Sequence, residues 1–70
     1  MEALKEFRLE KTLSKDRMAR KIGVSTSFFE KVENGHAKPS RGFMEKLKSV
    51  YPEVNLDKMF FSDLQKVGDI

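Results

Sequence analysis

Apolar residues recur along this chain at three- and four-residue intervals, the spacing that places side chains on one face of an α-helix. The intervals predict helices over about residues 3–11, 15–22, 26–33 and 41–50, and a short fifth helix after residue 55. The expected inward positions are Leu4, Phe7, Met18, Ala19, Ile22, Phe29, Val32, Phe43 or Met44, Leu47, Val50, Leu56, Met59 and Phe60. Sustained apolar–polar alternation, which would indicate strands, is missing from the sequence. The pattern therefore predicts a compact all-α fold of five short helices.

Polar and glycine residues mark where these helices begin and end. Side-chain oxygens placed just before a helix accept hydrogen bonds from its first N–H groups. The expected N-caps are Ser14, Ser25, Ser40 and Asn55. Gly23 follows the second helix and can adopt the left-handed conformation cheaply, Asn34-Gly35 stops the third, and Pro52 prevents extension of the fourth.

A length of 70 residues indicates one small domain. With 39% hydrophobic and 36% charged residues, it has the composition of a globular protein, and without cysteine it has neither a disulfide nor a thiolate metal site. No apolar run approaches the roughly 20 residues that span a bilayer, and the first residues lack the pattern of a signal peptide. A cytoplasmic protein is expected.

The net charge of +3 is unevenly distributed along the chain. Residues 1–38 carry nine Lys or Arg and six Asp or Glu, whereas residues 39–70 carry five of each. A protein with one nucleic-acid-binding face would show such an asymmetry.

Nothing in the sequence indicates an enzyme, a metal site or a cofactor. His36 is the only histidine, and it has neither a cysteine nor paired carboxylates nearby in the sequence. A glycine-rich phosphate loop and a nucleophile–base pair are also missing. His36 is expected to be a loop residue near a phosphate.

The most informative stretch is residues 15–34. Two helices of about eight residues are joined there by a tight turn at Gly23, and Ala19 lies four positions before that glycine. Two helices that cross steeply need a small residue where they approach, which Ala19 supplies, and the turn needs a positive φ, which Gly23 supplies.

This stretch resembles the helix-turn-helix of lambda-type phage repressors, Cro proteins and their bacterial relatives, the XRE-type family. The resemblance rests on residues 13–25, on Glu33-Asn34-Gly35-His36-Ala37-Lys38-Pro39-Ser40 and on Asn55-Leu56-Asp57-Lys58-Met59-Phe60, and it covers about residues 4–60. It implies a DNA-binding domain over residues 1–61, with a C-terminal tail over residues 62–70.

The resemblance also implies roles for single residues. Lys15 matches a phosphate-contacting position where the family often has Gln, and Arg8 and Glu33 match a pair joined by an inward salt bridge. Thr26, Ser27 and Lys31 match positions that face base edges. The predicted DNA-binding residues are Lys15, Arg17, Ser25, Thr26, Ser27, Phe28, Lys31, Asn34, His36, Lys38 and Arg41. Because Thr26 and Ser27 carry only short hydroxyls, specificity is expected to rely on Lys31, Phe28 and DNA shape.

Several of these positions leave alternatives open. Phe28 either belongs to the edge of the core or contacts a thymine methyl group, and Glu30 either reads cytosine or orients a neighbouring lysine. Lys31 either contacts DNA or is a solvated charge. Arg41 either reaches the DNA or remains on the free surface.

The predicted function is a sequence-specific transcriptional regulator of bacterial or phage type, a repressor that binds double-stranded DNA. A homodimer would read the two halves of a palindromic operator, about 34–36 Å apart. Phe60, Phe61, Leu64 and Val67 either form its dimer surface, or Phe60 closes the core and the others are incidental. The alternative function is a protein-interaction module on the same fold, such as an antitoxin or antirepressor component.

Overall fold

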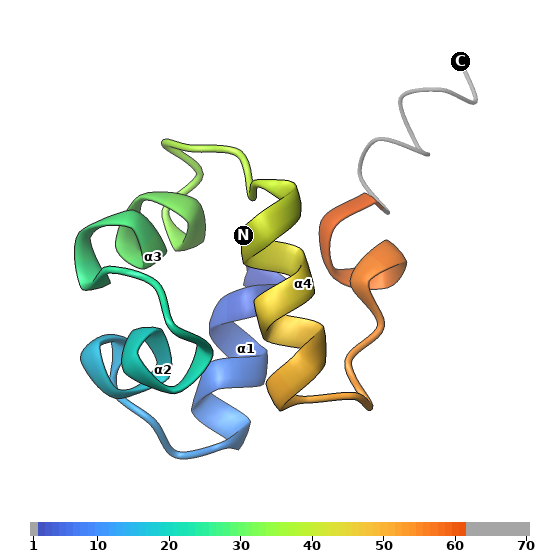
Figure 1. Cartoon of the computed structure of the whole chain (residues 1–70), viewed down its shortest axis with the longest axis horizontal. Coiled ribbons are helices and arrows are strands. Elements are labelled where there is room, and N and C mark those ends of the chain that lie inside the picture. Colours follow the sequence, from blue (N-terminus) through green and yellow to red (C-terminus); the bar gives the residue numbers. More distant parts are fainter. Residues whose placement is uncertain (1, 62–70) are drawn as a thin grey trace.

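The computed structural model describes residues 2–61, which form five helices and no strand. The helices are α1 (Glu2–Glu10), α2 (Lys15–Ile22), α3 (Thr26–Glu33), α4 (Arg41–Val50) and η1 (Asp57–Phe61). Figure 1 shows α2 and α3 on one side of the molecule and η1 on the other, with α1 and α4 between them. The all-α prediction is confirmed, although η1 is a single π-helical turn and α1 begins and ends one residue earlier than expected.

One hydrophobic core joins all five elements. Its buried members are Leu4, Met18, Ala19, Ile22, Phe29, Val32, Phe43, Leu47, Tyr51, Val54 and Phe60. The ring of Phe43 lies at the centre of an aromatic group, with the centroids of Phe28, Phe29 and Phe60 between 5.8 and 6.3 Å away. The core therefore accommodates the phenylalanine at position 29, which is fully buried.

The predicted inward position of Val50 is wrong. Val50 is 38% exposed, whereas Tyr51, which was not among the expected core residues, is only 8% exposed. Phe43, Leu47 and Tyr51 follow one another at four-residue intervals, and this row forms the buried face at the end of α4. The ring of Tyr51 packs edge-on against Phe7 of α1, with 5.2 Å between the centroids, which holds Tyr51 rather than Val50 inward.

All four predicted N-caps are confirmed. Each cap oxygen accepts a hydrogen bond from the backbone N–H three residues later, at N···O distances of 3.0–3.2 Å. The capping residues are Ser14, Ser25, Ser40 and Asn55. These bonds satisfy N–H groups that the helices themselves leave without partners.

The end of α1 contains a strained residue. Thr12 has a φ of 55°, in the left-handed region that β-branched residues rarely adopt. The turn is closed by two backbone bonds, from the Thr12 N–H to Leu9 O at 2.9 Å and from the Leu13 N–H to Arg8 O at 3.3 Å. This is the pattern in which glycine is usually found immediately after a helix.

The ring of Tyr51 lies beside two lysine side chains. The ammonium groups of Lys11 and Lys21 lie 5.4 and 5.9 Å from the ring centroid, within the range of cation–π attraction. The phenolic oxygen is buried and has no hydrogen-bond partner among the described residues. The ring is thus well packed while its hydroxyl group carries an uncompensated desolvation cost.

Candidate nucleic-acid interface

Capping residues and a glycine within the α2–turn–α3 unit determine where its helices begin and end. Ser14 caps α2, and Asp16 places a carboxylate in its first turn, where the helix dipole favours negative charge. The helix ends at Gly23, whose φ is 84°, and the N–H groups of Gly23 and Val24 both bond Ala19 O, at 2.9 and 3.0 Å. Ala19 is fully buried, and the helix that carries it packs on both α3 and α4.

A lysine of α4 reinforces this turn from outside the unit. Lys46 Nζ donates a hydrogen bond to Gly23 O at 3.1 Å. A Cβ atom at position 23 would lie 3.9 Å from Lys46 Cδ, so the turn needs glycine because of its φ and not because of a lack of space. Sequence reasoning missed Lys46, since nothing near it in the sequence indicates a partner 23 residues away.

Helix α3 has one buried and one exposed face. Phe29, Val32 and Glu33 are buried, whereas Ser27 and Lys31 are exposed. The helix ends at Glu33 and is followed by Asn34 and by Gly35, whose φ is 83°. His36 N bonds Lys31 O at 2.8 Å, and Gly35 N bonds Val32 O at 3.1 Å. This tight end turns the chain into the loop that leads to α4 (Figure 1).

Polar contacts join the exposed faces of α2 and α3. Thr26 Oγ1 lies 2.8 Å from Asp16 Oδ1 and donates its proton to that carboxylate. Lys15 Nζ lies 3.8 Å from Glu30 Oε2, and Arg20 Nε lies 3.3 Å from Asp16 Oδ2. Both acidic residues on this surface are therefore next to a cation, and the position of Glu30 agrees with the alternative in which it orients a lysine.

Two of the predicted DNA-binding residues contact acidic side chains across the two helices. Lys15 lies beside Glu30, and Thr26 donates a hydrogen bond to Asp16. Phe28 is partly buried and packs edge-on against Phe43, which agrees with the alternative that places it at the edge of the core. The remaining predicted residues that are exposed are Arg17, Ser25, Ser27, Lys31, Asn34, His36, Lys38 and Arg41. They lie along α2, α3, the following loop and the start of α4 without bonds between their side chains.

A buried ion pair fixes the far end of α3 to α1. Arg8 Nε and Nη2 donate to the two carboxylate oxygens of Glu33, at 2.8 and 3.3 Å. Arg8 Nη1 also donates to Leu13 O at 2.8 Å, in the connection between α1 and α2. The side chains of Arg8 and Glu33 are only 8% and 2% exposed, so this two-bond pair joins three segments inside the protein.

Other kinds of site are not found in the described part of the chain. Residues 2–61 contain no cluster of three or more histidine or carboxylate side chains that would hold a metal ion. Within the same residues, no helix has the length and apolar character to cross a membrane.

Comparison with known protein families agrees with this geometry. A family model described as a helix-turn-helix domain matches residues 2–51, which include the whole of α1–α4. No curated protein and no solved structure gave a match. Since the matched residues contain both helices, the Gly23 turn and the Arg8–Glu33 pair, the chain belongs to the helix-turn-helix domain family.

Proposed function

We propose that this protein is a sequence-specific transcriptional regulator of the lambda-repressor and Cro type, and that it represses by placing α3 in the DNA major groove. The observation that carries the proposal is the division of α3 into a buried face and a free polar face. Phe29, Val32 and Glu33 hold the helix to the core, while Ser27 and Lys31 remain exposed. A helix held rigidly in this way presents its outer side chains at a fixed depth and angle.

The side chains at this surface divide into two kinds of contact. The Ser25 oxygen accepts from the Phe28 N–H, which leaves the Ser25 O–H to donate to a phosphate oxygen. Lys31 is the longest donor on the outer face of α3 and fits the acceptors of guanine, a contact that discriminates by about 1–3 kcal/mol. Thr26 gives its proton to Asp16, so it offers bases its methyl group and oxygen lone pairs.

Phosphate contacts surround this reading surface. Lys15 and Arg17 lie in the first turn of α2, which Ser14 caps. His36 and Lys38 are exposed in the loop after α3. These contacts would hold the register on DNA without carrying sequence information. Because most of the binding free energy would be electrostatic, affinity is expected to fall steeply as salt rises.

A dimer on a palindromic operator is part of the proposal, with half-sites about 34–36 Å apart. Phe60 does not contribute to a dimer surface, because it is 5% exposed and closes the core. The tail at residues 62–70, with Leu64 and Val67, lies outside the described residues. Dimerisation therefore has to be tested with the whole chain.

Selection of bound sites from random double-stranded DNA, followed by anisotropy titrations at two salt concentrations, tests the proposal. We expect Lys31→Ala to relax one base position and Lys15→Ala to weaken all sites alike. Lys58→Ala removes the same charge from η1, on the other side of the molecule, and serves as the control. Failure to enrich any site, or affinity that does not change with salt, would contradict the proposal and favour a protein-binding role.

A further inference from the structure

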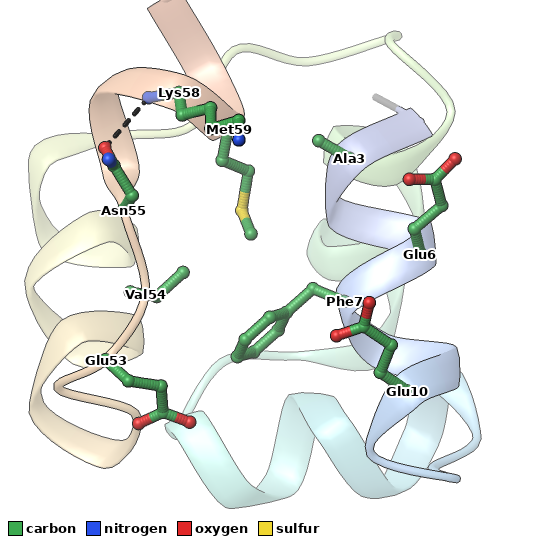
Figure 2. Close-up of a pocket in the computed structure, with 9 residues that line it drawn as sticks. All are labelled: Ala3, Glu6, Phe7, Glu10, Glu53, Val54, Asn55, Lys58 and Met59. Carbon is green, nitrogen blue, oxygen red and sulfur yellow. Dashed lines mark hydrogen bonds between the residues drawn. The ribbon is translucent and has the colours of Figure 1, made fainter.

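A groove lies between α1 and residues 53–59, and none of the residues that line it belongs to α2 or α3. Its volume is about 320 Å³. Figure 2 shows the ring of Phe7 and the side chains of Val54 and Met59 pointing into the space between the two segments. None of these residues belongs to the helix-turn-helix unit. DNA binding by that unit therefore does not explain the groove.

The floor of the groove is apolar, and one of its side chains is flexible. Val54 is 3% exposed, while Phe7 and Met59 are partly buried and pack on the core. The edge-on contact with Tyr51 fixes the Phe7 ring from behind. Met59 is unbranched and flexible, so it can adjust to an apolar side chain that enters from solvent. An apolar floor that is open to solvent favours the burial of a partner's side chain there.

The rim of the groove is acidic. Glu6, Glu10 and Glu53 line it, against a single Lys58, although the protein as a whole carries a net charge of +3. Glu53 accepts a hydrogen bond from Lys11 at 2.9 Å, and this bond lowers the pKa of the Glu53 carboxyl. The groove thus has the opposite charge to that expected of a DNA-binding surface.

Two of these carboxylates oppose the stability of the helix that carries them. Glu6 and Glu10 are four residues apart on α1, where like charges repel. Glu10 is also the last residue of α1, at the negative end of the helix dipole. Neither forms an ion pair or a hydrogen bond with any described residue. A cation bound between them would relieve both unfavourable interactions.

We propose that this groove is a docking surface for a protein segment in which a bulky apolar side chain is flanked by Lys or Arg. The apolar side chain would rest on Phe7, Val54 and Met59, and its basic neighbours would pair with Glu6 and Glu10. Charge complementarity selects this partner and repels nucleic acid. Because η1 and α1 lie away from the outer face of α3 (Figure 1), the protein can hold the partner and DNA at once.

The docking surface does not depend on the proposed function, so its test uses the full chain without DNA. Two short synthetic peptides carry the same central Leu-Phe pair, one flanked by lysines and the other by serines. Each is titrated into isotope-labelled protein while backbone amide chemical shifts are recorded. We expect the lysine peptide to shift the amides of residues 3–10 and 53–59, and the serine peptide to bind much more weakly.

A charge-neutral double variant, Glu6→Gln with Glu10→Gln, should bind the lysine peptide about fivefold to tenfold more weakly than the unchanged protein. This variant removes a like-charge repulsion, so it should fold at least as stably. Glu45→Gln is the matched control, because this exposed glutamate of α4 does not line the groove. Equal binding of both peptides, equal loss in the control, or shifts confined to α2 and α3 would overturn the proposal. Sedimentation in which the double variant alters self-association would do the same, because a second copy would then cover the groove.

Discussion

Substitution of Glu33 by alanine leaves the Arg8 guanidinium buried without its carboxylate. Both N···O contacts of the pair, at 2.8 and 3.3 Å, are lost, and Arg8, whose side chain is 8% exposed, cannot recover its hydration without moving. Removing one partner of such a buried pair costs about 3–5 kcal/mol. At ~0.05–0.15 kcal/mol per residue, a chain of 70 residues has a total stability of about 3.5–10 kcal/mol. The variant should therefore lose roughly a third of its stability or more.

Urea denaturation followed by circular dichroism at neutral pH measures this loss. A second variant, Arg8→Met with Glu33→Leu, removes both charges and keeps apolar volume in their place. Its free energy of unfolding should be closer to that of the unchanged protein than the value for Glu33→Ala is, because no buried charge is left without a partner. It still loses the bond from Arg8 to Leu13 O, so full recovery is not expected.

The comparison of the two variants separates charge from packing. If Glu33→Ala costs less than about 1 kcal/mol, the value typical of exposed ion pairs, the pair is hydrated in solution and the reasoning fails. If the double variant is as unstable as Glu33→Ala, shape rather than the unpaired charge determines the cost. A cycle of the unchanged protein, Arg8→Met, Glu33→Leu and the double variant gives the coupling energy directly.

Three further predictions concern α1 and its surroundings. Thr12→Gly should raise the stability by about 1 kcal/mol, because it relieves the positive φ of 55°, and a fall in the urea midpoint would contradict this. Tyr51→Phe should leave the stability unchanged or raise it by up to about 1 kcal/mol, since the buried hydroxyl has no partner among the described residues, and a clear loss would show that this hydroxyl is hydrogen-bonded in solution. The hydrogen bond from Lys11 lowers the pKa of Glu53. The bond therefore stabilises the fold above pH 4.5, the ordinary pKa of a glutamate, and this contribution is lost as the pH falls through the folded-state pKa. Glu53→Gln should therefore reduce the decline in melting temperature below about pH 4.5, and an unchanged acid profile would refute that contribution.

Features that depend on neighbouring residues could be predicted from the sequence. The four N-caps and the turns at Gly23 and Gly35 each involve a residue and backbone groups within a few positions, so the local pattern was sufficient. The Arg8–Glu33 pair, which joins residues 25 positions apart, was expected only through the resemblance to a family. Composition and spacing alone gave no reason to join those two charges.

The features that were missed depend on distant packing. Tyr51 replaces Val50 in the core because Phe7, far away in the sequence, offers it a ring to pack against. The bond from Lys46 to Gly23 and the groove at Met59 arise only once α4 and η1 are placed against other helices. The sequence also gave no sign that Thr26 would donate its hydroxyl proton, since Asp16 lies ten positions away, across the turn.

The contact between Lys15 and Glu30 has a consequence for the number of ions set free when DNA binds. Lys15 already lies 3.8 Å from a carboxylate of its own protein, so a phosphate would replace Glu30 as its neighbour. The carboxylate left behind would then take up a cation from solution, which offsets one of the cations released from the DNA. The number of ions released on DNA binding would therefore be smaller than the number of basic side chains that touch phosphates. The difference between the two numbers would equal the number of internal ion pairs that are exchanged for phosphate contacts.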